Sequence, residues 1–198
     1  MTNIRTIKYL TQIELKRLLK AIDSPKNNSI YRKRDRAIFT LAYYHGLRAS
    51  ELGLIKLSDI DFSKARIRIN RLKNSLGGEY PIQLEEIKAL KAWLKQGKNA
   101  TQYLFPSQRK TPISRRQIGH LMEKYGRIAG IPKSKRHFHV LKHSIATHLL
   151  EAGADIRFVQ DWIGHKSILN TVIYAQITNR LRDEQALKLF ANPLIVKL

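Results

Sequence analysis

The fold is decided by the stretch HVLKHSIATHLLEAGADIRFVQDWIGHKSILNTVIYA, residues 139–175. Apolar residues recur there at helical spacing over residues 139–151 and 155–163, and Gly153 and Gly164 stand just after the two runs. Glycine ends helices because it adopts left-handed backbone angles without steric cost. The stretch therefore predicts two helices joined by a tight turn, with a further helical segment at its end.

The helical pattern also covers much of the remaining chain. Thr11 and Glu14 form a capping box before the first apolar run, and Gly46 supplies a stop for the second. Further helices are predicted over residues 11–22, 31–45, a short segment from 49, 84–94, 114–129 and 178–190. The chain is therefore predicted to be mainly helical.

One region departs from this pattern. Apolar and polar residues alternate over residues 65–70, as in a half-buried strand, and glycines 77–78 close a hairpin onto residues 80–82. We place Asp59 and Asp61 in the turn before it. The predicted class is α+β: mainly α with a small antiparallel β-sheet.

The charge balance indicates the kind of partner. Lys and Arg number 37 against 15 Asp and Glu, which gives a formal net charge of +22. The basic residues occur in nearly every segment, including residues 32–36 and 115–136, so the folded surface itself is cationic. Neutralising phosphates with release of counterions rewards such a surface. Nucleic acid is favoured over anionic membranes and acidic proteins, although charge alone does not indicate catalysis.

Several function classes are disfavoured by composition. The chain has no cysteine, which removes disulfides, thiolate nucleophiles and cysteine zinc sites. We see no signal peptide and no stretch of membrane-spanning length, and therefore expect a cytoplasmic protein. There is no Walker-type glycine loop and no carboxylate cluster of the two-metal kind. No cofactor or metal is expected.

Three groups of residues could carry chemistry. In the first, Arg48 follows the predicted helix stop at Gly46, and Glu51 comes three residues later. An arginine at such a corner projects from a rigid part of the backbone. The alternative is a local surface ion pair between Arg48 and Glu51, which contributes little. These residues alone leave both interpretations open.

The second group lies on the helix over residues 139–151. Helical geometry places His139, Lys142 and His143 on one face, with a buried apolar stripe opposite. A solvated polar face and a two-histidine zinc site are the alternatives. A lysine between the histidines would repel a metal cation, so the face is better suited to an anion.

The third group follows the helix stop at Gly164. It consists of His165, Lys166 and Thr171, with Tyr174 one helical turn after Thr171. Tyrosine is far more often a half-buried packing residue than a nucleophile, and the chain has 8 of them. This group is uninformative by itself.

Taken in order, the three groups resemble the signature of tyrosine recombinases of the phage-integrase family, from Leu10 almost to the C-terminus. The resemblance implies the family's catalytic-domain fold. It also implies a site-specific DNA recombinase, or integrase, that cleaves and rejoins strands through a covalent 3′-phosphotyrosine intermediate. Tyr174 matches the nucleophile, Arg48 the first catalytic arginine and Glu51 its supporting carboxylate. Lys73, in the hairpin loop, resembles the catalytic lysine.

The remaining positions match less uniformly. His139 matches the first histidine of the family's histidine–arginine–histidine motif, and His143 matches its last histidine, a supporting residue. Lys142 stands where the second arginine is usual, which departs from the pattern because lysine lacks the two-pronged donor that suits phosphate. We expect slower or adapted chemistry rather than its loss. His165 matches the third conserved basic position.

This set of residues suits phosphoryl transfer. Attack on a phosphodiester adds negative charge to the non-bridging oxygens, which Arg48, Lys142 and His165 could stabilise. Lys73 could protonate the leaving oxygen, and His139 could accept the proton of the tyrosine. The phosphotyrosine ester keeps the bond energy, so rejoining needs neither ATP nor metal.

The resemblance also shapes the expected architecture. We expect one catalytic domain over residues 1–198 without a preceding core-binding domain, as in the short recombinases that switch bacterial fimbriae. The run of residues 71–73 is similar to theirs. Residues 178–198 could be exchanged between protomers. The expected partner is double-stranded DNA, bound by a homotetramer that is monomeric in solution, with accessory DNA-binding proteins as a further class.

Two other functions stay open at this point. The first is a non-catalytic DNA-binding regulator, because residues 152–174 also fit a helix-turn-helix. The second is an enzyme resembling type IB topoisomerases, which would relax supercoils without synapsis. Strand cleavage separates the first from the recombinase, and recombination separates the second.

Overall fold

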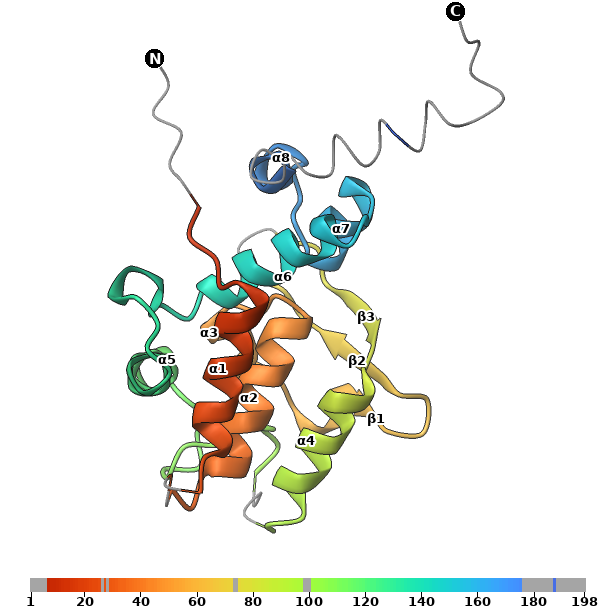
Figure 1. Cartoon of the computed structure of the whole chain (residues 1–198). Coiled ribbons are helices and arrows are strands. Elements are labelled where there is room, and N and C mark those ends of the chain that lie inside the picture. Colours follow the sequence, from red (N-terminus) through yellow and green to blue (C-terminus); the bar gives the residue numbers. More distant parts are fainter. Residues whose placement is uncertain are drawn as a thin grey trace, which may run out of the picture.

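The computed structural model describes residues 7–25, 27, 29–72, 75–97, 101–175 and 187. Helix α2 (Arg32–Tyr44) lies at the centre and contacts α1 (Gln12–Asp23), α4 (Leu84–Leu94) and α6 (Val140–Glu151) (Figure 1). A small three-stranded antiparallel sheet completes the arrangement. The mainly helical α+β class predicted from the sequence is confirmed.

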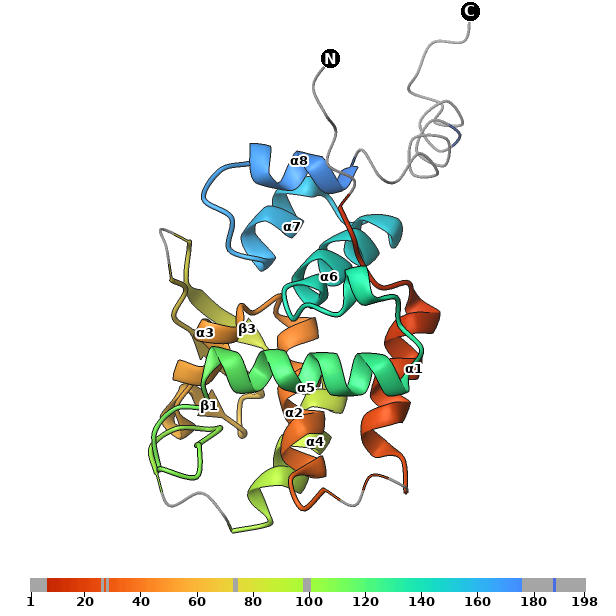
Figure 2. The ribbon, with the colours of Figure 1, turned by 90° about the vertical axis from the view of Figure 1, so that its left-hand side faces the viewer.

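The helices begin where the sequence supplies caps. In the capping box of α1, Glu14 Oε2 accepts a hydrogen bond from Thr11 N at 2.8 Å, and Thr11 Oγ1 accepts one from Glu14 N at 3.2 Å. Helix α5 (Arg115–Ile128) is capped in the same way and packs across the outside of α1 and α3 (Ala49–Leu54) (Figure 2). These helix boundaries agree with the predicted ones to within one or two residues.

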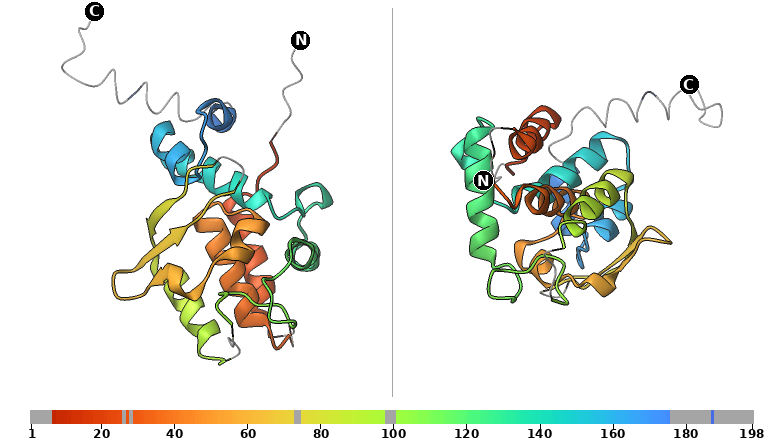
Figure 3. Two further views of the ribbon diagram at one scale, coloured as in Figure 1. Left: turned by 180° about the vertical axis from the view of Figure 1, so that it is seen from behind. Right: turned by 90° about the horizontal axis from the view of Figure 1, so that it is seen from below.

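The sheet has one more strand than the sequence indicated. Strand β2 (Arg66–Ile69) pairs with β3 (Gly78–Pro81) and, on its other edge, with β1 (Ile60–Asp61), which follows a 3-10 turn over Leu57–Asp59. The placement of Asp61 in a turn is therefore wrong, because its backbone pairs with β2. The sheet and α5 lie on opposite sides of α2 (Figures 1 and 3).

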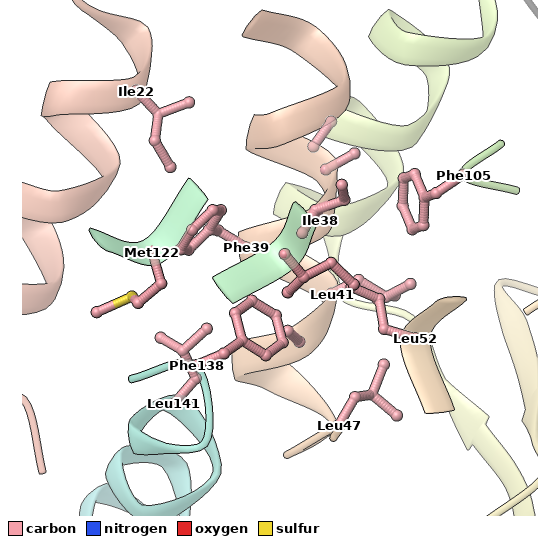
Figure 4. Close-up of a cluster of buried hydrophobic side chains, with 14 of the residues drawn as sticks. Ile22, Ile38, Phe39, Leu41, Leu47, Leu52, Phe105, Met122, Phe138 and Leu141 are labelled. Atoms are coloured by element: carbon pink, nitrogen blue, oxygen red, sulfur yellow. The ribbon is translucent and has the colours of Figure 1, made fainter. Parts of the chain in front are cut away.

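Most buried apolar side chains form one large core around α2. Figure 4 shows part of it, where Phe39 of α2 lies near Met122 of α5 and Phe138. The rings of Phe39 and Phe138 meet edge to face with centroids 5.7 Å apart. This core fixes the start of α6 against α2 and α5.

The last three described helices gather at one end of the molecule (Figures 1 and 2). They are α6, α7 (Ile156–Trp162) and α8 (Leu169–Ala175), which contact one another around a second, smaller apolar cluster. A 3-10 turn, Lys133–Lys135, precedes α6. The helix predicted over residues 178–190 lies outside the described residues, Leu187 excepted. In the described part of the chain, no helix has the length and apolar character needed to cross a membrane.

Candidate active site

A pocket of about 740 Å³ opens where the N-terminus of α3 meets α6 and α8. Its wall is made by four separate segments of the chain. The lining residues are Arg48, Ser75, His139, His143, His165, Lys166, Ser167, Asn170, Ile173 and Tyr174. Five of the eight candidate catalytic and supporting residues are therefore brought together: Arg48, His139, His143, His165 and Tyr174.

The first wall is built around Arg48 at the start of α3. Helix α2 ends before Gly46, whose φ of 56° turns the backbone toward α3. Glu51 Oε2 accepts a hydrogen bond from Arg48 N at 2.9 Å, and Glu51 Oε1 accepts one from Arg48 Nη1 at 2.6 Å. Arg48 Nη1 also donates to Ser75 Oγ at 2.9 Å. The guanidinium is thereby held at the pocket with part of its surface open.

Glu51 is a buried counter-charge rather than a surface partner. It is only 2% exposed, and Arg71 Nη1 lies 3.4 Å from its Oε2. Burial raises the pKa of the Glu51 carboxyl, but hydrogen bonds from Arg48 and the charges of Arg71 and Arg48 outweigh it, so the pKa lies below its usual value. The alternative interpretation of Arg48 and Glu51 as a surface ion pair is therefore wrong, because Glu51 is buried.

The predicted polar face of α6 is divided. His139 and His143 line the pocket with ring centroids 4.5 Å apart. Lys142 instead is 0% exposed, and its Nζ donates to Ile163 O at 2.7 Å. The expectation that Lys142 opens onto the same spot as the two histidines is wrong. Burial, together with the charges of Arg71 and Arg48, lowers the Lys142 pKa to about 7.

Tyr174 lies on α8 with its side chain 1% exposed. Its hydroxyl is 2.9 Å from Nδ1 of His143. Burial raises the pKa of Tyr174, while the charge of Arg48 lowers it in part. The phenol is therefore protonated at neutral pH, and any nucleophilic role needs a base beside it. The sequence assigned His143 only a supporting part and did not indicate this contact.

His165 faces Tyr174 from the turn between α7 and α8. The two rings stack with centroids 6.2 Å apart, and His165 Nδ1 is 3.1 Å from Thr171 Oγ1. Burial and the charges of Lys142 and Arg48 lower the His165 pKa to about 3. Without a phosphate in the pocket the His165 imidazole is therefore neutral at pH 7, and a positive charge on it next to a bound phosphate stays a prediction.

The other two histidines are neutral for similar reasons. The pKa of His139 falls to about 4 through desolvation and the charges of Lys142 and Arg48. The pKa of His143 falls to about 3 through desolvation and the neighbouring His139. A neutral imidazole offers one donor and one acceptor nitrogen, so both can take part in proton transfer.

Some predicted features cannot be placed. Lys73, the candidate catalytic lysine, lies outside the described residues, as does most of the segment 178–198. Among the residues that are described, no three His, Cys, Asp or Glu side chains are grouped so as to hold a metal ion.

Arg71 is a residue of the site that the sequence analysis missed. It was quoted only as part of the run of residues 71–73, yet its buried side chain contacts Glu51 beside Arg48. Sequence offers little signal for such a role because charge alone suggests exposure.

Known proteins are similar to this chain both in sequence and in fold. The model of the phage integrase family matches residues 8–180. The chain belongs to this family. The phage integrase fold is also that of a crystal structure of XerA recombinase, which is similar with a TM-score of 0.77 and 32% identity over 91% of this chain and 64% of that one.

Individual members of the phage integrase family are similar at moderate identity. Tyrosine recombinase XerA of Thermococcus onnurineus is 37% identical over 90% of this chain, which spans 61% of that protein. Type 1 fimbriae regulatory protein FimE of Escherichia coli K12 is 34% identical over 84% of each chain. The chain thus spans about three fifths of XerA and most of FimE.

Proposed function

We propose that this chain is a site-specific DNA recombinase that cleaves and rejoins strands through a covalent 3′-phosphotyrosine at Tyr174. The observation that carries the proposal is the buried Tyr174 hydroxyl, 2.9 Å from His143 Nδ1, in a pocket that Arg48 also lines. A packing tyrosine needs no base and no cation. A nucleophile attacking a phosphodiester needs both.

The electrostatics of the pocket favour an anionic substrate. The three histidine pKa values are depressed by burial and by neighbouring positive charge. Burial is the main cause, but the part contributed by Lys142 and Arg48 reflects positive charge at the pocket, which a phosphate would offset. Together with a net charge of +22, this supports double-stranded DNA as the substrate.

The proposed reaction divides the work among the residues. His143, with its proton on Nε2, accepts the phenolic proton through Nδ1 as the Tyr174 oxygen bonds to phosphorus. Its 2.9 Å contact favours it over His139 as the acceptor. Arg48 stabilises the charge on the non-bridging oxygens, while Lys142 contributes its charge from behind the pocket. The bond to the leaving 5′ oxygen breaks, and Lys73 as the proton donor to that oxygen stays a prediction.

The assembly belongs to the same proposal. Strand exchange between two duplexes requires four active sites, so we infer a monomer in solution and a homotetramer on DNA, aided where needed by accessory DNA-binding proteins. The apolar residues of segment 178–198 would suit the exchange of this segment between protomers. We also propose that residues 1–198 form a single catalytic domain and that the reaction takes place in the cytoplasm.

The direct test uses supercoiled plasmid and nicked suicide oligonucleotides drawn from the chain's own genomic flanks, without added metal. We expect a denaturation-resistant protein–DNA adduct with the native protein and none with Tyr174→Phe. DNA bound without any adduct would contradict the proposal and favour a DNA-binding regulator. Adduct and relaxation without strand exchange between two sites would favour an enzyme like type IB topoisomerases.

A further inference from the structure

The last turn of α7 ends on two buried basic side chains. Arg71 Nη2 donates to Trp162 O at 3.0 Å, and Lys142 Nζ donates to Ile163 O at 2.7 Å. These are consecutive carbonyls at a helix C-terminus, where backbone acceptors lack intrahelical partners and the helix dipole favours positive charge. The two side chains come from the β2–β3 hairpin and from α6, so three elements meet at this turn.

Arg71 also contacts the turn that leads to Arg48, on the other side of the pocket. Its Nη2 donates to His45 O at 2.7 Å, and its Nη1 donates to Gly46 O at 3.2 Å. These carbonyls belong to the turn that ends α2 and leads directly to Arg48. One fully buried guanidinium therefore joins the turn before Arg48 to the turn before His165.

The segment after Trp162 fits closely against this contact. Gly164 has φ of 69°, and a side chain added there would lie 2.9 Å from Arg71 Nε and 2.7 Å from Leu76 O. Leu76 N in turn donates to Gly164 O at 3.2 Å. The next residue is His165, which lines the pocket. The direction of the His165 ring thus depends on a turn fixed from two sides.

The identity of residue 142 fits the presence of Arg71. Arg71 and Lys142 are both fully buried, and Arg71 helps to lower the pKa of Lys142. A second guanidinium at position 142 would bring a larger cation to the same buried space. Lysine supplies a single compact donor, which is enough for one carbonyl.

We infer that Arg71 and Lys142 act together as positioning residues that lock the turn of residues 162–165 against the turn before Arg48. The pair sets the spacing between the guanidinium of Arg48 and the imidazole of His165, so that both face one phosphate. This inference rests on the proposed recombinase function for its purpose, but the lock itself exists without DNA.

Hydrogen exchange of the DNA-free protein tests the lock independently of activity. Leu76, Gly164 and His165 all have amides that donate backbone hydrogen bonds at this junction. In Arg71→Met and in Lys142→Met, we expect these three amides to exchange about tenfold faster, relative to the amides of the α2 core. In Arg71→Lys, which restores one donor, the acceleration should be smaller.

The adduct assay adds a functional readout. Arg71→Met should form the Tyr174 adduct about 100-fold more slowly, since a displacement of about 1 Å has that effect on a reacting group. DNA affinity should stay within about threefold of the native value because a single charge is lost. Arg36→Met is the matched control, since it removes an arginine from a surface ion pair with Asp23 and should leave both readouts unchanged.

Two results would overturn the inference. Unchanged exchange at the three amides in both methionine variants would mean that the pair does not hold the turn. An equal acceleration in α2 and at the turn would mean that Arg71 stabilises the fold as a whole and positions nothing in particular. If the native protein forms no adduct but the local acceleration is present, the lock stands and the proposed function fails. If Arg71→Met does not fold, Lys142→Met and Arg71→Lys are judged by the same criteria.

Discussion

The pocket has two walls, the Arg48 wall at the start of α3 and the Tyr174 wall formed by α8 with the histidines around it. Different forces hold these two walls. On the Arg48 wall, the buried Glu51 carboxylate accepts hydrogen bonds from Arg48 and lies 3.4 Å from Arg71 Nη1. On the Tyr174 wall, the described partners are neutral histidines, one hydrogen bond to the hydroxyl and the small apolar cluster of α6, α7 and α8. Buried charge fixes the Arg48 side chain, whereas Tyr174 itself is held by neutral contacts and packing, although Arg71 and Lys142 hold the turn before His165.

This difference matches what each wall has to do. A guanidinium that stabilises developing charge works best when its direction is fixed before the substrate arrives. A nucleophile, by contrast, has to shift as its oxygen forms the bond to phosphorus. Charge-assisted hydrogen bonds suit the first task, whereas weaker contacts allow the second.

Removing the carboxylate of the rigid wall should have the largest effect. In Glu51→Gln, Arg48 and Arg71 lose their buried counter-charge, and we expect unfolding to become easier by about 3–5 kcal/mol. Chemical denaturation at pH 7 measures this. Because the Glu51 pKa is lowered in the folded state, its contribution is present above pH 4.5 and is lost as the pH falls below that value.

A matched control for this change is Glu85→Gln on α4. Glu85 forms an exposed pair with Lys88, with 3.1 Å between Oε1 and Nζ. Such a pair contributes at most about 1 kcal/mol. Equal losses in the two variants would mean that the Arg48 wall is not held by charge, and the comparison between the walls would fail.

On the Tyr174 wall, the histidine that holds the hydroxyl should dominate activity. We expect His143→Gln to slow adduct formation about 100-fold, because proton acceptance at the nucleophile is lost. His139→Gln should slow it less, since the structure gives His143 the contact with Tyr174. Single-turnover cleavage of suicide substrates compares the two. The reverse order would return the acceptor role to His139.

Acid should loosen the two walls in different pH ranges. The folded-state pKa values of His143 and His165 are lowered to about 3, so the stability they contribute is complete above about pH 6.5 and declines as the pH falls. The loss is at most about 1.4 kcal/mol per pH unit for each histidine. The Glu51 contribution declines only below pH 4.5.

Hydrogen exchange at pH 7 and pH 5 separates these ranges. After correction for intrinsic rates, we expect amides of α8 to become less protected at pH 5 while those of α3 keep their protection. A double variant, His143→Gln with His165→Gln, should remove most of the pH effect on α8. Equal loss of protection in α3 and α8 would show that the histidines do not account for the difference.

The sequence predicts the fold more completely than the site. Helix boundaries follow from apolar spacing, caps and glycine stops such as Gly46 and Gly164, which are local signals. Strand β1 was missed because two residues, Ile60–Asp61, are too short to alternate. Its pairing with β2 is a contact between segments, which local periodicity does not carry.

The site shows the same limit in its charged residues. The motif positions and the family resemblance indicated Arg48, His165 and Tyr174, and all three line the pocket. They did not indicate that Lys142 is buried or that Arg71 is a buried contact, because both roles depend on carbonyls from distant turns. The neutral state of the histidines likewise arises from burial and neighbouring cations, which exist only in the folded chain.

The smallest expected effect concerns the residue that orients His165. Thr171 is 0% exposed, with its Oγ1 at 3.1 Å from His165 Nδ1. When the hydroxyl donates to Nδ1, the ring proton is kept on Nε2, which can then donate to a phosphate oxygen. Thr171→Val keeps the shape but removes the hydroxyl, at a cost of about 1 kcal/mol, or roughly fivefold in adduct rate. Thr171→Ser keeps the hydroxyl and should therefore retain the His165 tautomer, which ¹⁵N NMR identifies. If Thr171→Val shows that same tautomer and an unchanged adduct rate, packing alone orients the ring.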